Sequence, residues 1–197
     1  MARPPRVFID TNELFPFTIM DVLLTLCEDL HFTWVWTDEI LEEWEIVIVR
    51  EGMRSRESAR SVTDVVREHF GQHRLDPALY RDKAAEDLSP DPDDRVHVAA
   101  CLYGDVDVML TRDVKHFRGV ALDAAQVEVQ TADAFLCRLL GRHGHGVAES
   151  FARAASAKEN PSTTPEHLAI AIARAGAPVF AERITAKFAG GVRGRRG

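Results

Sequence analysis

Cysteine is scarce in this chain, and its placement argues against the sites that cysteine usually builds. The three cysteines, Cys27, Cys101 and Cys137, lie far apart, are odd in number, and include no pair with metal-ligand spacing. Each falls in an apolar stretch with a helical pattern. We therefore predict three buried, reduced thiols.

Long apolar runs are also missing. No run approaches the ~20 apolar residues that a membrane-spanning helix needs. The basic start of the chain is followed by an apolar run of only Val7 to Ile9, which is too short for a signal peptide. At 197 residues the chain fits one domain with a small appendage. These features predict a cytoplasmic protein with no membrane partner.

Positive charge is in short supply. The chain has 24 Lys and Arg against 31 Asp and Glu, a net charge of -7. This balance argues mildly against a nucleic-acid partner, because phosphate contacts need Lys and Arg. A cluster of catalytic acids would shift the net charge in the same direction, so the total decides little.

Four segments have the character of strands, and helical patterns fill most of the chain between them. The strands are expected at Val7–Ile9, Phe32–Thr37, Val106–Thr111 and Val127–Gln130. The expected helices are Leu14–Leu30, Glu39–Val49 with a Thr37 or Asp38 cap, Ser58–Phe70 with Val62, Val65, Val66 and Phe70 on one side, Asp94–Tyr103 and Ala132–Leu140. This order predicts an α/β fold, a three-layer α/β/α sandwich with a central, mostly parallel sheet.

The composition changes at residues 141–146, after which the chain is rich in alanine. Further helices are expected at Val147–Ala157, Pro165–Ala175 and Val179–Phe188. We predict a main domain over residues 1–140, a helical extension over 141–190 and a disordered tail over 191–197. His143 and His145, next to glycines, are expected in a flexible turn.

Two further groups are read as structural. Trp34, Trp36 and Trp44 are predicted to be core or interface aromatics rather than platforms for stacked bases. His97 lies within an apolar helical stretch, which predicts a packed ring or a hydrogen bond to a neighbour.

Acidic residues follow the strands or precede a helix at one predicted edge of the sheet. Asp10 ends the first strand, Asp113 follows the third, and Asp94 precedes a helix. In a parallel sheet the carboxyl ends of strands share one edge, where ligands bind. Glu43 borders the apolar stripe of its helix, whereas Glu42 points toward a solvated face, so we prefer Glu43 as a fourth member.

Carboxylates gathered in this way repel one another unless a cation lies between them. Mg²⁺ or Mn²⁺ suits oxygen ligands, and either ion can activate a bound water toward a phosphate. Asn12 could bond a ligand or the water of the metal, and Thr111 could orient Asp113 or a phosphate.

Ordinary structural roles compete with this interpretation. For Asp91 and Asp93 we favour helix capping or turn formation over metal binding. Asp113 suits an Asx turn, and Glu42 or Glu43 alone suits a solvated helix surface. Asp10 is the hardest to explain structurally, because it follows three apolar strand residues.

Four pieces of the sequence together resemble the PIN domain nuclease family, including the toxin ribonucleases of bacterial type II toxin–antitoxin systems. The pieces are Phe8 to Asn12, Thr37 to Trp44, Asp91 to Ala100 and Asp107 to Phe117, and they stand in the order of the family. The resemblance spans residues 6 to about 135.

The resemblance implies a Mg²⁺- or Mn²⁺-dependent endoribonuclease with an α/β/α sandwich. It implies that Asp10, Glu43, Asp94 and Asp113 are the catalytic metal acids. It also implies an RNA substrate, frequent homodimerisation and, for a toxin, inhibition by a small antitoxin protein. Arg95, Arg112 and Lys115 are candidates to hold the RNA backbone, although all three also suit an exposed surface.

One position departs from the family pattern. Many relatives have an acid before the phenylalanine of the last piece, where this chain has His116. The site then has one carboxylate fewer, which favours one metal or weaker binding of a second. We interpret His116 as a surface residue, with phosphate contact as the alternative.

Two other functions compete with RNA cleavage. A degenerate, non-catalytic module that binds RNA or a partner protein would agree with His116 and with the negative net charge. An aspartyl-phosphate phosphatase also begins with an acid after the first strand, but it needs a second acid two residues later, where this chain has Asn12.

Overall fold

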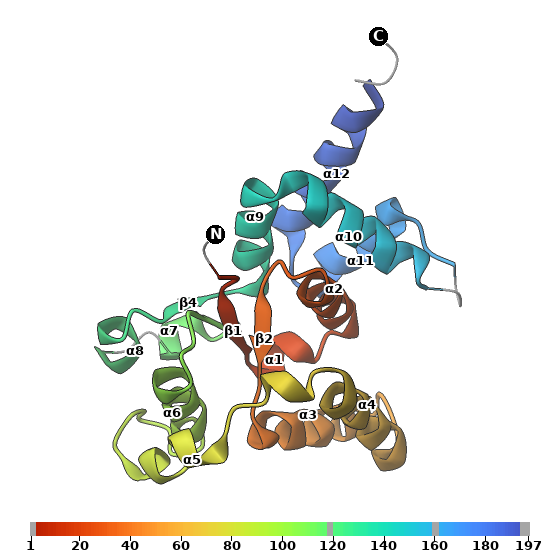
Figure 1. The fold of residues 1–197 in the computed structure, drawn as a ribbon. Coiled ribbons are helices and arrows are strands. Elements are labelled where there is room, and N and C mark those ends of the chain that lie inside the picture. The colour runs from red at the N-terminus through yellow and green to blue at the C-terminus, as the bar shows by residue number, and fades with distance from the viewer. Residues whose placement is uncertain (1–2, 118–119, 159–161, 194–197) are drawn as a thin grey trace. The chain divides into compact units, whose positions relative to one another are not determined.

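A computed structural model describes residues 3–117, 120–158 and 162–193 (Figure 1). Its contacts group the chain into two units. The sheet unit contains residues 1–15 and 33–130, and the helical unit contains residues 16–32 and 131–197. This grouping differs from the domain boundary expected from the sequence at residue 140. The expected division into a main domain and a helical extension stays a prediction.

The sheet unit is built on a parallel sheet of four strands in its described part, in the order β2-β1-β3-β4. The strands are β1 Arg6–Ile9, β2 Thr33–Val35, β3 Val108–Leu110 and β4 Glu128–Gln130. Each lies within or close to a segment predicted as a strand. The parallel sheet with many helices confirms the predicted fold class, a PIN-like α/β/α fold with additional C-terminal helices.

The centre of the sheet is apolar on both faces, as expected for a parallel sheet covered by helices. Val7, Phe8 and Ile9 of the central strand β1 are fully buried, and Phe8 stands opposite Val35 and Met109. Trp34, Trp36 and Trp44 are also buried, which confirms their predicted place in the core.

Helices and short turns connect the strands of this unit. They are α1 Thr11–Leu14, α3 Asp38–Arg50, α4 Arg56–His69, η1 Gly71–His73, α5 Pro77–Tyr80, η2 Asp82–Ala85, α6 Arg95–Tyr103, α7 Val114–Phe117 and α8 Val120–Ala124. Thr37 caps α3 through a hydrogen bond from the backbone N–H of Ile40, so the cap is Thr37 rather than Asp38. Val65 of α4 is 53% exposed, so its predicted place on the apolar side of that helix is wrong.

The single helix predicted over Leu14–Leu30 is wrong, because the chain forms two helices there. Helix α1 ends at Leu14, and α2 begins at Phe17. Pro16 lies between them; it has no N–H to continue a helix, and its ring restricts the residue before it. Its carbonyl instead accepts the first hydrogen bonds of α2, from the N–H groups of Ile19 and Met20.

The helical unit consists of α2 and the C-terminal helices. They are α2 Phe17–Glu28, α9 Ala132–Arg142, α10 Gly144–Ser156, α11 Pro165–Ala175 and α12 Pro178–Arg193. The core of this unit includes edge-to-face ring pairs, Phe32 with Phe135 and Phe151 with Phe180. All of the helices predicted for the last third of the chain are present.

Two details of the C-terminal prediction are wrong. His145 belongs to the first turn of α10 rather than to a flexible turn. Gly146 lies in the same turn and packs against His31. Any larger residue would place its Cβ 2.9 Å from the His31 ring, closer than normal packing allows. Helix α12 also continues to Arg193, so the tail predicted over 191–197 begins within a helix, and residues 194–197 lie outside the described residues.

The thiols and the membrane prediction can also be checked. Cys27, Cys101 and Cys137 are free and buried, as predicted. Burial raises the pKa of the Cys101 thiol well above its usual value, which keeps it protonated and unreactive. None of the helices in the described ranges is long and apolar enough to cross a membrane.

Candidate metal centre at the edge of the sheet

The carboxyl ends of β1 and β3 meet at one edge of the sheet, and Asp10 lies between them. Its backbone N–H donates a hydrogen bond of 2.9 Å to the carbonyl of Leu110 and so continues the pairing of the two strands. The Asp10 residue is only 7% exposed. The predicted position of this acid at the edge of the sheet is therefore the observed one.

Thr111 and Asn12 connect the loops that follow the two strands. The Thr111 hydroxyl donates to Asp10 Oδ2 at 2.7 Å and accepts a hydrogen bond of 3.1 Å from the N–H of Asp113. The Asn12 amide donates to Thr111 Oγ1 and to Asp113 Oδ2, at 3.2 and 3.3 Å. Asn12 Oδ1 accepts from the N–H of Arg112. These bonds hold Asp10 and Asp113 at the same edge.

The charge on Asp10 is poorly compensated. Burial raises the pKa of its carboxyl above the ordinary value, and the nearby Glu43 carboxylate raises it further. The hydrogen bond from Thr111 and the ring of His97 act in the opposite direction without reversing the shift. A carboxylate in this position is stabilised when a cation lies next to it.

Glu43 reaches the site from α3. His97 Nε2 lies 3.0 Å from Glu43 Oε2, and this hydrogen bond is the main cause that lowers the Glu43 pKa. The His97 ring is buried beside Phe8, with ring centroids 5.9 Å apart. The packed and bonded role predicted for His97 is present. Glu42 is exposed and lines a separate hollow, so the geometry agrees with the preference for Glu43.

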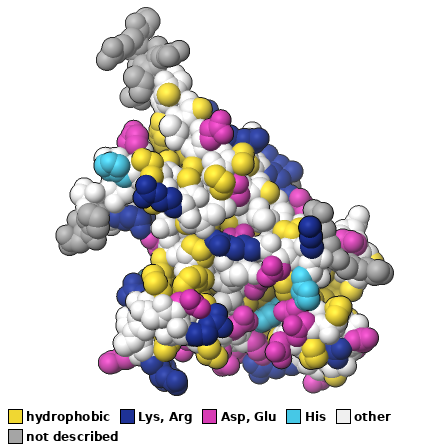
Figure 2. All heavy atoms as spheres, turned by 180° about the vertical axis from the view of Figure 1, so that it is seen from behind, with side chains coloured by type: hydrophobic (Ala, Val, Ile, Leu, Met, Phe, Trp, Pro, Cys, Tyr) yellow, Lys and Arg dark blue, Asp and Glu magenta, His cyan; other side chains and the backbone are white. Residues whose placement is uncertain are grey.

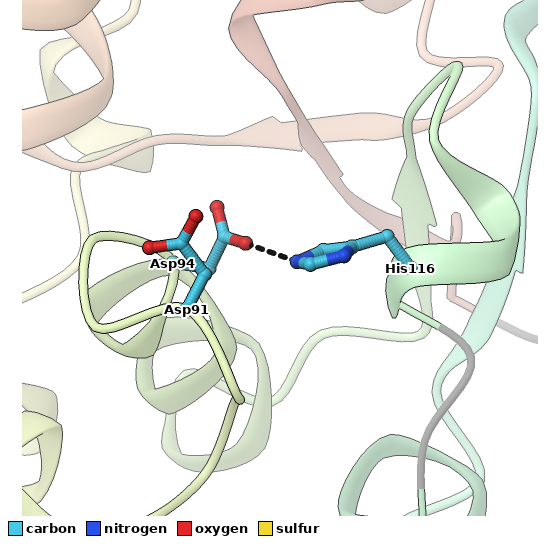
Figure 3. A group of neighbouring side chains, drawn as sticks. All are labelled: Asp91, Asp94 and His116. Carbon is cyan, nitrogen blue, oxygen red and sulfur yellow. Dashed lines mark hydrogen bonds and ion pairs between the residues drawn. The ribbon is translucent and has the colours of Figure 1, made fainter.

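Asp94 reaches the site from the start of α6. It occupies the N-cap position of that helix, but its side chain makes no capping hydrogen bond. Its Oδ2 instead lies 2.7 Å from His116 Nε2, and Asp91 lies close to both groups (Figure 3). His116 is exposed, as its interpretation as a surface residue requires, yet that surface is the wall of the site.

These residues line one open cleft with a volume of about 640 Å³. The face shown in Figure 2 carries a gathering of acidic and histidine side chains in its lower part. The lining residues of the cleft are Asp10, Thr11, Asn12, Phe15, Glu43, Val47, Arg50, Glu51, Asp91, Asp94, Arg112, Asp113, His116 and Phe117. The four acids expected at the site thus share one cleft.

Comparison with protein families gives two matches. A model described as PIN domain matches residues 6–115, which is more than half of the chain. The chain belongs to the PIN domain family. A model described as VapC50 C-terminal domain matches residues 132–186. A search of curated proteins and a search of solved structures each found no match.

The two family matches divide the PIN chain into a sheet-bearing part and a helical part. The PIN match includes the three strands β1, β2 and β3 and the four acids expected at the site, whereas the second match begins at the start of α9. Together they are consistent with a VapC-type PIN toxin nuclease. The helices from α9 into α12 are therefore similar to this described domain.

Of the three basic residues predicted to hold RNA in this PIN protein, only Arg112 lines the cleft. The Nε atom of Arg112 lies 3.4 Å from Oε2 of the buried Glu13. Arg95 does not line the cleft, because its guanidinium bonds the carbonyl of Ser89 and the carboxylate of Asp87. Lys115 is exposed and lies outside the set of lining residues.

Several residues of the cleft were not singled out as site residues from the sequence. Arg50 is the clearest case, since it follows Glu43 by seven residues and Val47 by three and so lies on the same side of α3. That spacing was a usable signal. Asp91 was expected to cap a helix or form a turn. Its Oδ1 does accept a hydrogen bond from the N–H of Asp93, and the residue also lines the cleft.

The donor set of the PIN cleft fits a divalent metal ion. Carboxylate oxygens from Asp10, Glu43, Asp94 and Asp113 are the ligands that Mg²⁺ and Mn²⁺ prefer. The raised pKa of the buried Asp10 carboxyl is independent support, because a cation next to it would relieve the cost of its charge.

Proposed function

We propose that this protein is a metal-dependent endoribonuclease and the toxin of a toxin–antitoxin pair. The observation that carries the proposal is the convergence of Asp10, Glu43, Asp94 and Asp113 on one cleft, with Asp10 buried and its pKa raised. Family membership supports a nuclease, and the chemistry of the cleft supports a metal and a phosphodiester substrate.

Each group of residues has a distinct task in this proposal. Asp10, Glu43, Asp94 and Asp113 hold Mg²⁺ or Mn²⁺, which supplies charge for a phosphate oxygen and lowers the pKa of a bound water. Thr111 and Asn12 keep Asp10 and Asp113 in place through the hydrogen bonds described above. Arg112 and Arg50, both in the wall of the cleft, offer positive charge to the RNA backbone.

The proposal extends to the partners of the chain. RNA is the substrate, and a small antitoxin protein is the inhibitor, as the VapC-type matches imply in general. The expected homodimer and the cytoplasmic location stay predictions. Arg95 and Lys115 become weaker candidates for RNA contact, since neither lines the cleft.

RNA cleavage by paired variants tests the proposal. Asp10→Asn and Asp113→Asn each keep the size of the side chain but remove a charged ligand, so we expect cleavage in Mg²⁺ or Mn²⁺ to fall about 100-fold or more. Asp93→Asn is the matched control, because Asp93 is an exposed acid outside the lining of the cleft. Its cleavage rate should equal that of the unmodified protein.

A failure of the unmodified protein to cut any RNA in either metal would contradict the proposal. Cleavage that survives in Asp10→Asn and Asp113→Asn would contradict the assigned site. Unfolding curves of the variants show whether a loss of activity comes from a loss of fold.

A non-catalytic PIN module is the second candidate, and one observation favours it. Two of the four acids already have a histidine as partner, since Glu43 bonds His97 and Asp94 bonds His116. Acids that already have hydrogen-bond donors from the chain have less need of a metal. Calorimetry that detects no binding of millimolar Mg²⁺ or Mn²⁺ would support this module over the nuclease.

The phosphatase alternative receives no support from the cleft. Asn12 stands where such an enzyme needs an acid, and its amide is engaged with Thr111 and Asp113. Its role is therefore to position other groups.

A further inference from the structure

Three potential metal ligands of different chemistry meet at the side of the cleft formed by α6 and α7. Asp91 and Asp94 come from the loop before α6 and from the start of that helix, and His116 comes from α7. One donor atom from each lies within 4.8 Å of the other two. Figure 3 shows the ring of His116 reaching across to the two carboxylates.

The spacing of these atoms suits a shared ion. Two ligand atoms that are each about 2.1 Å from a metal, at the angles of an octahedral or tetrahedral site, lie roughly 3.0–3.4 Å apart. His116 Nε2 and Asp94 Oδ2 are 2.7 Å apart in the hydrogen-bonded pair. A small separation of this pair is enough to admit an ion between the ring and the carboxylate.

Local structure leaves the two carboxylates available for this role. Asp94 has the position of a helix cap, yet its side chain makes no capping bond and points to His116 instead. The turn at Asp91 uses one carboxylate oxygen, Oδ1, to accept from the N–H of Asp93. Neither carboxylate is therefore fully committed to holding the loop.

We infer that Asp91, Asp94 and His116 form a mixed carboxylate–imidazole site that takes a first-row transition-metal ion in preference to Mg²⁺. The inference rests on the proposed function for the catalytic role of Asp94, and it specifies the class of metal that this part of the cleft binds. Imidazole nitrogen is a good ligand for transition-metal ions, whereas Mg²⁺ prefers oxygen. The ring of His116 therefore supplies the selectivity, and Asp94 links this site to Asp10 and Asp113.

Manganese is the probe for the test, because its unpaired electrons report directly on a bound nitrogen. Pulsed electron paramagnetic resonance of the full-length protein with Mn²⁺ should show coupling to a ¹⁴N nucleus. In His116→Ala this coupling should disappear, and calorimetry should show Mn²⁺ affinity lower by roughly tenfold or more with a smaller change for Mg²⁺. Asp91→Asn should weaken the binding of Mn²⁺ while the nitrogen coupling remains.

Matched controls separate this site from general effects of charge and histidine content. Asp93→Asn removes an exposed acid two residues from Asp91, and His145→Ala removes a histidine whose side chain is 88% exposed. Both should leave the coupling and both affinities unchanged. His116→Gln, which keeps a hydrogen-bonding side chain, provides a second test if His116→Ala fails to fold.

The absence of nitrogen coupling in the unmodified protein, or its persistence in His116→Ala and His116→Gln, would overturn the inference and leave His116 as a hydrogen-bond partner alone. Coupling assigned to His116 in a protein that cuts no RNA would refute the proposed function and keep the metal site. RNA cleavage without this coupling would refute the metal site alone.

Discussion

At the scale of a single residue, two opposing effects act on the pKa of the Asp10 carboxyl. It lies at the end of a buried strand, where burial disfavours its charge, and it accepts a hydrogen bond from Thr111 that favours the charge. Burial dominates, so the pKa of Asp10 is raised. In the absence of a cation, the ionised carboxylate therefore makes the folded state less stable.

Asp10→Asn should consequently stabilise the metal-free protein at neutral pH. A group whose pKa is raised on folding loses its stabilising contribution as the pH rises through the folded-state value. Removing the charge should raise the free energy of unfolding by about 1 kcal/mol, a shift of roughly 2–4 °C in the melting temperature of a chain this long.

Thermal unfolding in the presence of a chelator measures this change. The difference between the variant and the unmodified protein should shrink as the pH is lowered and Asp10 takes up its proton. A variant that is less stable at neutral pH would show that the Thr111 hydrogen bond to a charged acceptor outweighs the cost of burial.

At the scale of single elements, helix α3 serves the core and the cleft at once. Ile40, Trp44 and Ile48 are buried in the core, whereas Glu43 and Arg50 line the cleft. The two sets lie on adjacent faces because residues three or four apart share one side of a helix. A shift of α3 by one residue would therefore remove Glu43 from the cleft.

Helix α12 depends on a side chain from another element. The Asp133 carboxylate of α9 accepts hydrogen bonds from the N–H groups of Val179 and Phe180, at 3.2 and 2.7 Å. These groups belong to the first turn of α12, where N–H groups have no partner within the helix. The half-buried carboxylate also complements the positive end of the helix dipole.

Asp133→Ala should lower the free energy of unfolding by about 1 kcal/mol, the usual effect of removing an N-terminal cap. Asp133→Asn should cost less, because its oxygen can still accept one hydrogen bond. Urea unfolding of the full chain measures both effects. Equal stability of Asp133→Ala and the unmodified protein would show that solvent satisfies these N–H groups equally well.

At the scale of the whole molecule, a partly buried histidine makes stability depend on pH. His31 Nε2 lies 3.2 Å from Ser150 Oγ, and its ring centroid lies 5.8 Å from that of His143. Burial lowers the pKa of His31, His143 lowers it further, and Asp29 opposes the shift. His31 therefore binds a proton less readily in the folded state than in the unfolded state.

The stability of the protein should therefore fall as the pH is lowered from about 7.5 to about 5.5, the range in which histidine titrates. His31→Gln should reduce this dependence, whereas exposed His167→Gln should leave it unchanged. Some dependence should remain, because burial also lowers the pKa of His73. Thermal unfolding at a series of pH values provides the measurement, and an unchanged profile in His31→Gln would contradict the role of His31.

The sequence by itself determined the elements and most of the acids in the cleft. Apolar strands followed by polar residues marked β1 and β3, and the period of α3 distinguished Glu43 from Glu42, because both patterns follow from local geometry. The break at Pro16 and the helical start at Gly144 were missed. Pro16 itself carries the local signal for the break, because proline has no N–H to continue a helix. Near Gly144 the glycines signal a turn, whereas Gly146 packs against His31 in the structure.

Only the tertiary structure decided which partners these side chains have. The contacts of Glu43 with His97 and of Asp94 with His116 join residues that are 54 and 22 positions apart, and no sequence period relates them. The tertiary structure also decided the partners of Arg95, whose guanidinium donates to Asp87 and to the Ser89 carbonyl outside the cleft. A local pattern specifies the face on which a residue lies, but the packing of separate elements determines what that residue meets.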